Sequence, residues 1–271
     1  METVYQFIGK QKIGIFGSGH LGREIGRGLL NAGLPRHNLV LCHRGSSNTE
    51  RAIAEAGLAD LIIPAKLLAS ISRIILYAVR PQDFRAIKPF ALLPDAILIS
   101  MLAGVPLTRL PICPPTVQRI RVMTSSPETL REGIGIAALY PSSSVLVREL
   151  LTALKLHIID LRHESDVHAF TALGPCLPIA LTYWEALGKE VDPTELSMMV
   201  SKFELPDESH LIGWARNAQP RNLSPEALSQ YISHSATPGG VTEAILKAID
   251  AGEPLALALE RGIRRSQELA S

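Results

Sequence analysis

A glycine-rich loop between a short apolar run and an amphipathic stretch most constrains what this chain can fold into. The segment Gly17-Ser18-Gly19-His20-Leu21-Gly22 fits the pattern G-x-G-x-x-G, follows an expected strand and opens an expected helix. Gly17 permits the tight turn, Gly19 lets the backbone approach a pyrophosphate, and Gly22 lets helix and strand pack closely. The helix start then offers free N–H groups to the phosphates. The loop predicts a dinucleotide site formed by all six residues. The alternative is a glycine-rich turn in an unrelated α/β protein.

Short apolar runs alternate with helical patterns through the first 160 residues. The runs are rich in β-branched residues, as expected for strands of a parallel sheet that helices cover on both faces. Helical patterns lie between them at 22–31, 49–56 and 82–92. This repeated order predicts a doubly wound sheet. The expected strands are 12–16, 38–42, 74–79, 97–101, 118–123, 136–140 and 156–160.

The pattern changes after about residue 160, beyond which no convincing strand is expected. Asp192-Pro193 and Ser224-Pro225 each place a capping side chain before a proline, which is typical of helix starts. We therefore expect an α/β fold class, with an N-terminal Rossmann-type dinucleotide-binding domain over residues 1–161. An all-α domain follows over residues 162–271.

Composition and charge argue against several classes of protein. Lys and Arg number 27 and Asp and Glu 26, so the net charge of +1 gives no basic footprint for nucleic acid. No apolar run approaches the ~20 residues that span a bilayer, and the N-terminus lacks the pattern of a secretory signal. Cys42, Cys113 and Cys176 are few, odd in number and widely spaced, which fits a reducing cytoplasm. The histidines show no metal-binding spacing, so no metal is assigned.

The end of the second expected strand indicates which dinucleotide binds. An NAD site usually carries Asp or Glu there, about 20 residues after the glycines, to bind the ribose 2′-hydroxyl. This chain has no carboxylate between Cys42 and Asn48. Arg44 with the hydroxyls of Ser46 and Ser47 fits a 2′-phosphate, and His43 is included in the same expected site. We predict NADPH rather than NADH, with a solvated loop arginine as the alternative for Arg44.

A second glycine-containing helix start lies in the helical half. Thr237-Pro238-Gly239-Gly240-Val241-Thr242 precedes an amphipathic stretch, so its N–H groups fit an anion. The hydroxyls of Thr237 and Thr242 add donors and acceptors. These features suit a small carboxylate next to a polar reacting group. As an isolated motif, the segment is more typical of a turn and helix cap.

Taken together, the motifs resemble those of the pyrroline-5-carboxylate reductase family over nearly the whole chain. The glycine loop and the turn at 237–242 match two family signatures. Three further segments match in the family's order: Ala78-Val79-Arg80-Pro81, Ser100-Met101-Leu102-Ala103-Gly104 and Arg121-Val122-Met123-Thr124-Ser125-Ser126-Pro127.

The resemblance implies an NADPH-dependent reduction of a cyclic imine that bears a carboxylate. The expected reaction is 1-pyrroline-5-carboxylate to proline, the last step of proline biosynthesis. It also implies a cytoplasmic homodimer formed through the helical domain, or a larger ring of such dimers, without nucleic acid or membrane partners. Thr242 falls where the family contacts the ring nitrogen, and the carboxylate site falls on Thr237, Gly239, Gly240 and Val241. The other cofactor residues implied are Ala78, Val79, Arg80, Pro81, Met101 and Ala103.

One segment departs from the family pattern. Gly174-Pro175-Cys176-Leu177-Pro178-Ile179 stands where the family has a Gly/Ser-rich stretch, which removes hydroxyls and adds bulk. Two alternatives to the imine reductase follow. One is a reductase for another acceptor such as a deazaflavin, against which the turn at 237–242 argues. The other is a nucleotide-binding homologue with an altered substrate or no activity.

Overall fold

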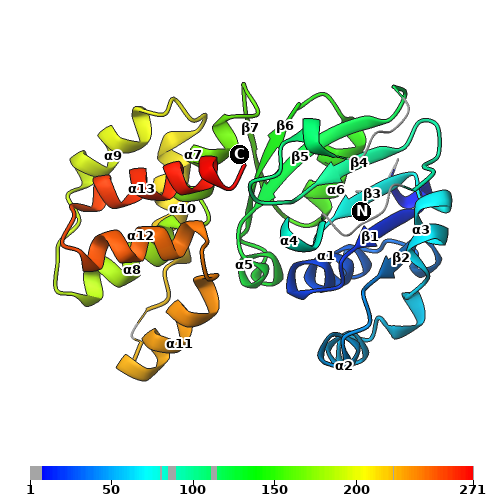
Figure 1. Ribbon diagram of the computed structural model, residues 1–271, viewed down its shortest axis with the longest axis horizontal. Helices are drawn as coiled ribbons and strands as arrows, with labels where there is room; N and C mark the ends of the chain where they lie inside the picture. The colour runs from blue at the N-terminus through cyan, green and yellow to red at the C-terminus, as the bar shows by residue number, and fades with distance from the viewer. Residues whose placement is uncertain (1–7, 80, 85–89, 111–114, 222, 271) are drawn as a thin grey trace. The chain divides into compact units, whose positions relative to one another are not determined.

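The computed structural model describes residues 8–79, 81–84, 90–110, 115–221 and 223–270. It divides into two compact units between Asp160 and Leu161 (Figure 1). The first unit contains the sheet, whereas the described residues of the second contain helices and no strand. The predicted fold class, a Rossmann-type α/β unit followed by a helical one, is confirmed.

A seven-stranded sheet with the order β2-β1-β3-β4-β5-β6-β7 organises the first unit. All seven predicted strands are present, and the first four and β6 consist largely of buried apolar residues. The sequence order along the sheet reverses between β1 and β3, which is where doubly wound sheets bind ligands. The strands are β1 (Ile13–Phe16), β2 (Leu39–Cys42), β3 (Ile74–Tyr77), β4 (Ile97–Ser100), β5 (Gln118–Thr124), β6 (Ile136–Tyr140) and β7 (His157–Asp160).

The sheet is parallel, as expected, except at one pair of strands. β6 pairs antiparallel with β5, whereas every other pair of neighbours is parallel. The connection between them, residues 125–135, holds only the short helix α5 (Pro127–Glu132). A parallel crossover needs a dozen or more residues, so this connection returns the chain in the opposite direction.

Local capping signals position the helices of the first unit. α1 ends at Asn31, and Gly33 follows with a φ of +97°, a left-handed conformation that glycine adopts without strain. The predicted helix over 82–92 is present at its start and absent over 90–92. α4 covers Pro81–Phe84, residues 85–89 lie outside the described residues, and 90–92 are irregular. The other helices are α1 (His20–Asn31), α2 (Ser47–Glu55), α3 (Ala65–Ile71) and α6 (Val145–Ala153).

The second unit is built from helices whose predicted starts are confirmed. The Asp192 carboxylate accepts the Thr194 N–H at 2.8 Å, and the Ser224 hydroxyl accepts the Ala227 N–H at 3.2 Å. None of its described helices, nor those of the first unit, is both long and apolar enough to cross a membrane. The helices are α7 (Asp166–Leu173), α8 (Leu177–Ala186), α9 (Pro193–Ser201), α10 (Glu208–Ala218), α11 (Pro225–Ser235), α12 (Val241–Asp250) and α13 (Leu255–Glu268).

The last two helices of this unit lie side by side (Figure 1). Gly262 on α13 permits the close approach, because an added Cβ would stand 2.5 Å from Cγ1 of Ile245 on α12. Burial of Val241, Ile245 and Ile249 along one face of α12 follows the predicted helical periodicity. The helix start at Gly240 is therefore held on a packed framework.

Candidate functional site

The glycine loop has the geometry that its three glycines predict. Gly17 has a φ of +101°, and an added Cβ would lie 2.6 Å from the carbonyl oxygen of Ala78. On Gly22, which is buried in α1, a Cβ would stand 1.9 Å from the Gly17 carbonyl oxygen. On Gly19 a Cβ would meet nothing within 4 Å. The loop therefore closes tightly on its own backbone and leaves open space at the start of α1, which fits a pyrophosphate.

The end of β2 holds this loop in place. The Cys42 carbonyl accepts the Gly17 N–H at 3.0 Å and the buried Ser18 hydroxyl at 3.1 Å. The Ser18 hydroxyl therefore hydrogen-bonds within the protein rather than facing a ligand. Burial raises the pKa of the neighbouring Cys42 thiol to about 11. His20, which the loop pattern places toward the cofactor, is exposed, with Nδ1 3.5 Å from the Glu128 carboxylate on α5.

The expected 2′-phosphate site contains a carboxylate that sequence reasoning missed. Arg44 is exposed, and its Nη2 lies 2.8 Å from Oδ2 of Asp83 on α4. Ser46 caps α2, since its hydroxyl accepts the Thr49 N–H at 3.2 Å. His43 Nδ1 accepts the Gly45 N–H at 2.9 Å, which shapes the loop. Arg44 is thus held by Asp83 at the edge where the adenosine ribose of a dinucleotide is expected.

We expect Arg44→Ala to raise the KM for NADPH about tenfold and to leave the KM for NADH nearly unchanged, because a charge-assisted bond to the 2′-phosphate is lost. Asp83→Asn should lower the KM for NADPH, because the guanidinium no longer has a competing carboxylate. Steady-state rates with both coenzymes check this. Arg51→Ala, at an exposed arginine on α2, is the matched control. Equal effects of Arg44→Ala on both coenzymes would contradict the role.

Other predicted cofactor residues gather at the same sheet edge. The Ala78 N–H donates to the Phe16 carbonyl at 2.8 Å, and the Met101 N–H donates to the Tyr77 carbonyl at 3.1 Å. The segments after β3 and β4 therefore begin beside the glycine loop. Val79 and Ala103 are half-buried in these segments. Arg80 lies outside the described residues, and Pro81 begins α4.

Arg121 on β5 supports the segment after β4, which the motif match alone did not indicate. It is 2% exposed, and its guanidinium donates to the carbonyls of Val105 and, at 3.1 Å, Leu102. A buried cation is costly unless its donors are used, so these bonds fix the backbone that follows Met101. Arg121 is therefore a positioning residue for the candidate cofactor edge.

The predicted carboxylate turn of the second unit is formed. The Gly240 N–H donates to the Thr237 carbonyl at 2.8 Å, Gly239 has a φ of +70°, and α12 begins at Val241. The donors of both glycines are thus already used, because the Gly239 N–H donates to Oε2 of Glu243 at 2.8 Å. Sequence reasoning missed this carboxylate, although a Glu in the first turn of a helix is a recognised capping signal.

Thr242 is 8% exposed, and its hydroxyl lies 3.3 Å from Sγ of Cys176. This contact links segment 174–179, which differs from the family pattern, to the residue predicted to contact the ring nitrogen. Burial raises the pKa of the Cys176 thiol to about 11, which keeps it protonated and inert as a nucleophile at neutral pH. His234, by contrast, is exposed, and its Nδ1 lies 2.7 Å from the Gln230 carbonyl of its own helix.

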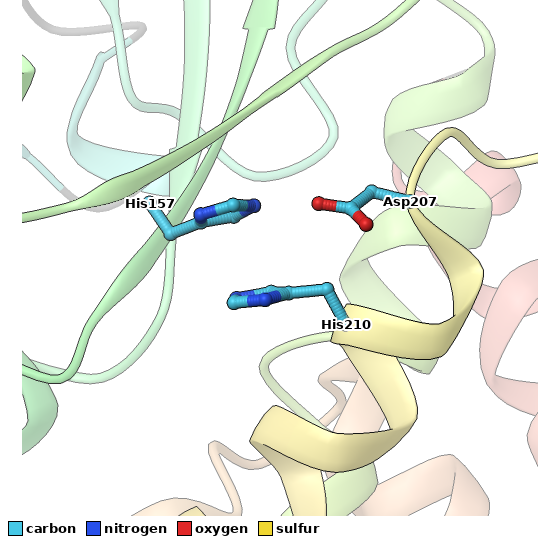
Figure 2. Close-up of side chains that lie close together, drawn as sticks. All are labelled: His157, Asp207 and His210. Carbon is cyan, nitrogen blue, oxygen red and sulfur yellow. The ribbon is translucent and has the colours of Figure 1, made fainter.

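Three side chains, those of His157, Asp207 and His210, are of the types that bind metal ions. Figure 2 shows His157 on β7 of the first unit and the side chains of Asp207 and His210 at the start of α10 of the second. The ligand atoms of Asp207 and His210 lie within 4.8 Å of one another. Among the described residues of their own unit, this pair supplies one carboxylate and one imidazole, whereas zinc sites usually use three or four protein ligands. We assign no metal.

Comparisons with solved structures give three pyrroline-5-carboxylate reductases of the same fold. The enzyme from Streptococcus pyogenes is 20% identical with a TM-score of 0.60, and the match covers 95% of this chain and 98% of that one. The Plasmodium falciparum protein, solved with NADP bound, is 19% identical with a TM-score of 0.57 and coverage of 97% and 99%. The Coxiella burnetii protein is 19% identical with a TM-score of 0.55 and coverage of 96% and 99%.

This chain has the fold of the pyrroline-5-carboxylate reductases. The predicted family resemblance is thereby confirmed for the fold. Residues 12–104 also match the family described as NADP oxidoreductase, coenzyme F420-dependent, which assigns this segment to an NADP-dependent oxidoreductase domain. A search of curated proteins gave no match. The reductase fold thus accounts for both units, and the family match covers the glycine loop and the segments after β2, β3 and β4.

Proposed function

We propose that the protein reduces a cyclic imine carboxylate with NADPH, with 1-pyrroline-5-carboxylate as the substrate and proline as the product. The reductase fold and the family match of residues 12–104 support this proposal. The observation that carries it is the turn from Thr237 to Gly240, which opens α12 with the shielded Thr242 hydroxyl in its first turn. This arrangement pairs anion-binding N–H groups with a polar group for the reacting nitrogen.

The first unit fits the cofactor. The open space above Gly19 admits a pyrophosphate, and the N–H groups at the start of α1 would bind it. Arg44 would leave its ion pair with Asp83 and bind the 2′-phosphate instead. NADPH, when bound, supplies the hydride. The chain itself provides orientation and exclusion of water, which carry much of the acceleration for a protonated imine that is already electrophilic.

In the second unit, the proposed role of Thr242 is to hydrogen-bond the ring nitrogen. Its hydroxyl has one hydrogen to donate and two lone pairs to accept, so it can bond both the imine and the amine product. The Cys176 thiol, held neutral by burial, shares this hydroxyl and fixes its rotamer. The proposed carboxylate site consists of Thr237, Gly239, Gly240 and Val241. To bind a substrate, the Gly239 and Gly240 N–H groups would have to leave Glu243 and the Thr237 carbonyl.

The test is NADPH oxidation with 1-pyrroline-5-carboxylate, followed by absorbance and by detection of proline. We expect Thr242→Ala to lower kcat/KM about tenfold to a hundredfold, because the bond to the reacting nitrogen is lost, and Thr242→Ser to retain most of the rate. Thr182→Ala is the matched control, since Thr182 is similarly buried and its hydroxyl donates to the Pro178 carbonyl of its own helix. An unchanged rate in Thr242→Ala would reject the assignment.

A nucleotide-binding homologue with an altered substrate or no activity is the second candidate. Two observations favour it. Cys176 and Leu177, in the segment that differs from the family pattern, are buried side chains. The Glu243 carboxylate already accepts the Gly239 N–H. In that case NADPH binds to the purified protein, as measured by calorimetry, and no imine carboxylate is turned over. Tight NADPH binding with no proline formed would select this candidate.

The homodimer, the cytoplasmic location and the place in proline biosynthesis belong to the same proposal. Large apolar side chains on the second unit support the homodimer, because Leu187, Met198 and Leu257 are 46%, 69% and 48% exposed. In a homodimer formed through this unit, a second copy of the chain would cover these side chains.

A further inference from the structure

The turn proposed to bind the substrate carboxylate already holds a carboxylate of the chain itself. Glu243 lies in the first turn of α12, and its Oε2 accepts the Gly239 N–H at 2.8 Å. The same oxygen lies 3.2 Å from Nζ of Lys247. An N–H of the anion-binding turn and a cation thus converge on one carboxylate oxygen, in the arrangement that a substrate carboxylate would use.

The neighbouring helix strengthens the field at this position. Arg265 on α13 donates from Nε to the Gly239 carbonyl at 2.8 Å. The Gly239 N–H, followed by Lys247 and Arg265, lowers the pKa of the Glu243 carboxyl below its ordinary value. Glu243 therefore stays ionised throughout the neutral range, and it is an anion that competes for this donor.

Charge also acts on any substrate that approaches. An imine carboxylate that binds here places a second negative charge beside the Glu243 carboxylate, and the two carboxylates compete for the single Gly239 N–H donor. Substrate binding there requires Glu243 to rotate away and to give up its bond with Gly239. An imine without a carboxylate makes no such demand, and in its protonated form the ring is attracted to the acid.

We infer that Glu243 is a specificity-determining residue, an internal competitor that disfavours cyclic imine carboxylates relative to cyclic imines without a carboxylate. This inference rests on the proposed function and deepens it, since it names the residue that sets how strongly this turn binds the carboxylate of the proposed substrate. The alternative is that Glu243 only caps α12, which would affect stability and leave substrate preference unchanged.

The experiment compares two imines, 1-pyrroline-5-carboxylate and 1-pyrroline, with NADPH and three forms of the full chain: wild type, Glu243→Gln and Glu243→Ala. We expect both variants to lower the KM for the carboxylate about tenfold, which corresponds to 1.4 kcal/mol. The KM for 1-pyrroline should stay the same or rise. Calorimetric binding of proline and of pyrrolidine gives the same comparison without turnover.

Glu260→Gln is the matched control, because Glu260 is a similarly exposed acid that pairs with a lysine, Lys202, at 2.6 Å. It should leave both KM values unchanged. If imines are reduced and the Glu243 variants change neither the KM ratio nor the binding ratio, Glu243 is a cap and the inference is overturned. If no form reduces either imine or binds proline, the proposed function itself fails, and the inference fails with it.

Discussion

Gly22→Ala is expected to destabilise the protein by more than about 3 kcal/mol and to weaken NADPH binding about a hundredfold. The added methyl would stand 1.9 Å from the Gly17 carbonyl oxygen, and both residues belong to one tight loop. The loop must therefore open, and it loses the N–H geometry that fits a pyrophosphate. Two such bonds to a charged group account for the loss of affinity. Thermal unfolding and calorimetric titration with NADPH measure the two effects.

Two glycines near the same loop separate a packing role from a binding role. Gly26→Ala, four residues on, is the packing control, because its nearest neighbour would be 3.6 Å away, and helix propensity should make it neutral or slightly stabilising. Gly19→Ala should keep the melting temperature and lose NADPH affinity, since the methyl would enter the open space above the loop. If Gly19→Ala binds NADPH as tightly as wild type, the loop does not hold the pyrophosphate.

Arg121→Met is expected to lower the free energy of unfolding by about 3 kcal/mol, which corresponds to a drop in melting temperature of about 6 to 12 °C. Methionine fills much of the same volume and leaves the carbonyls of Leu102 and Val105 without the guanidinium donor. The segment after β4 then loosens, so the KM for NADPH should rise as well. Denaturant titration gives the stability and initial rates give the KM.

Arg119→Met on the same strand provides the comparison. Arg119 is half-buried, and its Nη1 lies a longer 3.5 Å from the Leu107 carbonyl, so its loss should cost under about 1 kcal/mol. Arg121→Lys should behave like the methionine variant, because one ammonium group cannot reproduce the fork that spans two carbonyls. Wild-type stability in Arg121→Met would show that other groups hold this segment.

The strands were predictable because burial on both faces of the sheet produces continuous apolar runs in the sequence. Each of β1 to β4 is a run of four residues, all of them buried, and such runs stand out against the helices around them. The direction of β6 produces no such pattern, since an apolar run looks the same from either end. The length of the connection at 125–135 was the available signal.

Site contacts divide in the same way between local and distant ones. The Gly239–Glu243 bond spans four residues, so a first-turn acid after two glycines was a signal for it. The contact of Cys176 with Thr242 spans 66 residues and depends on how α8 and α12 pack, which no short pattern encodes. The pairing of Arg44 with Asp83 depends on the order of strands in the sheet, and was out of reach for the same reason.

The last carbonyl of β2 accepts bonds from both Gly17 and Ser18, so a single oxygen ties the two halves of the cofactor edge together. Converting this protein from one coenzyme to the other is therefore a problem of backbone register as well as of side-chain charge. Substitutions at 43–48 that leave the Cys42 carbonyl in place can change the contacts to the ribose without altering the glycine loop. Insertions or deletions there would shift the oxygen and alter both ends of the nucleotide at once.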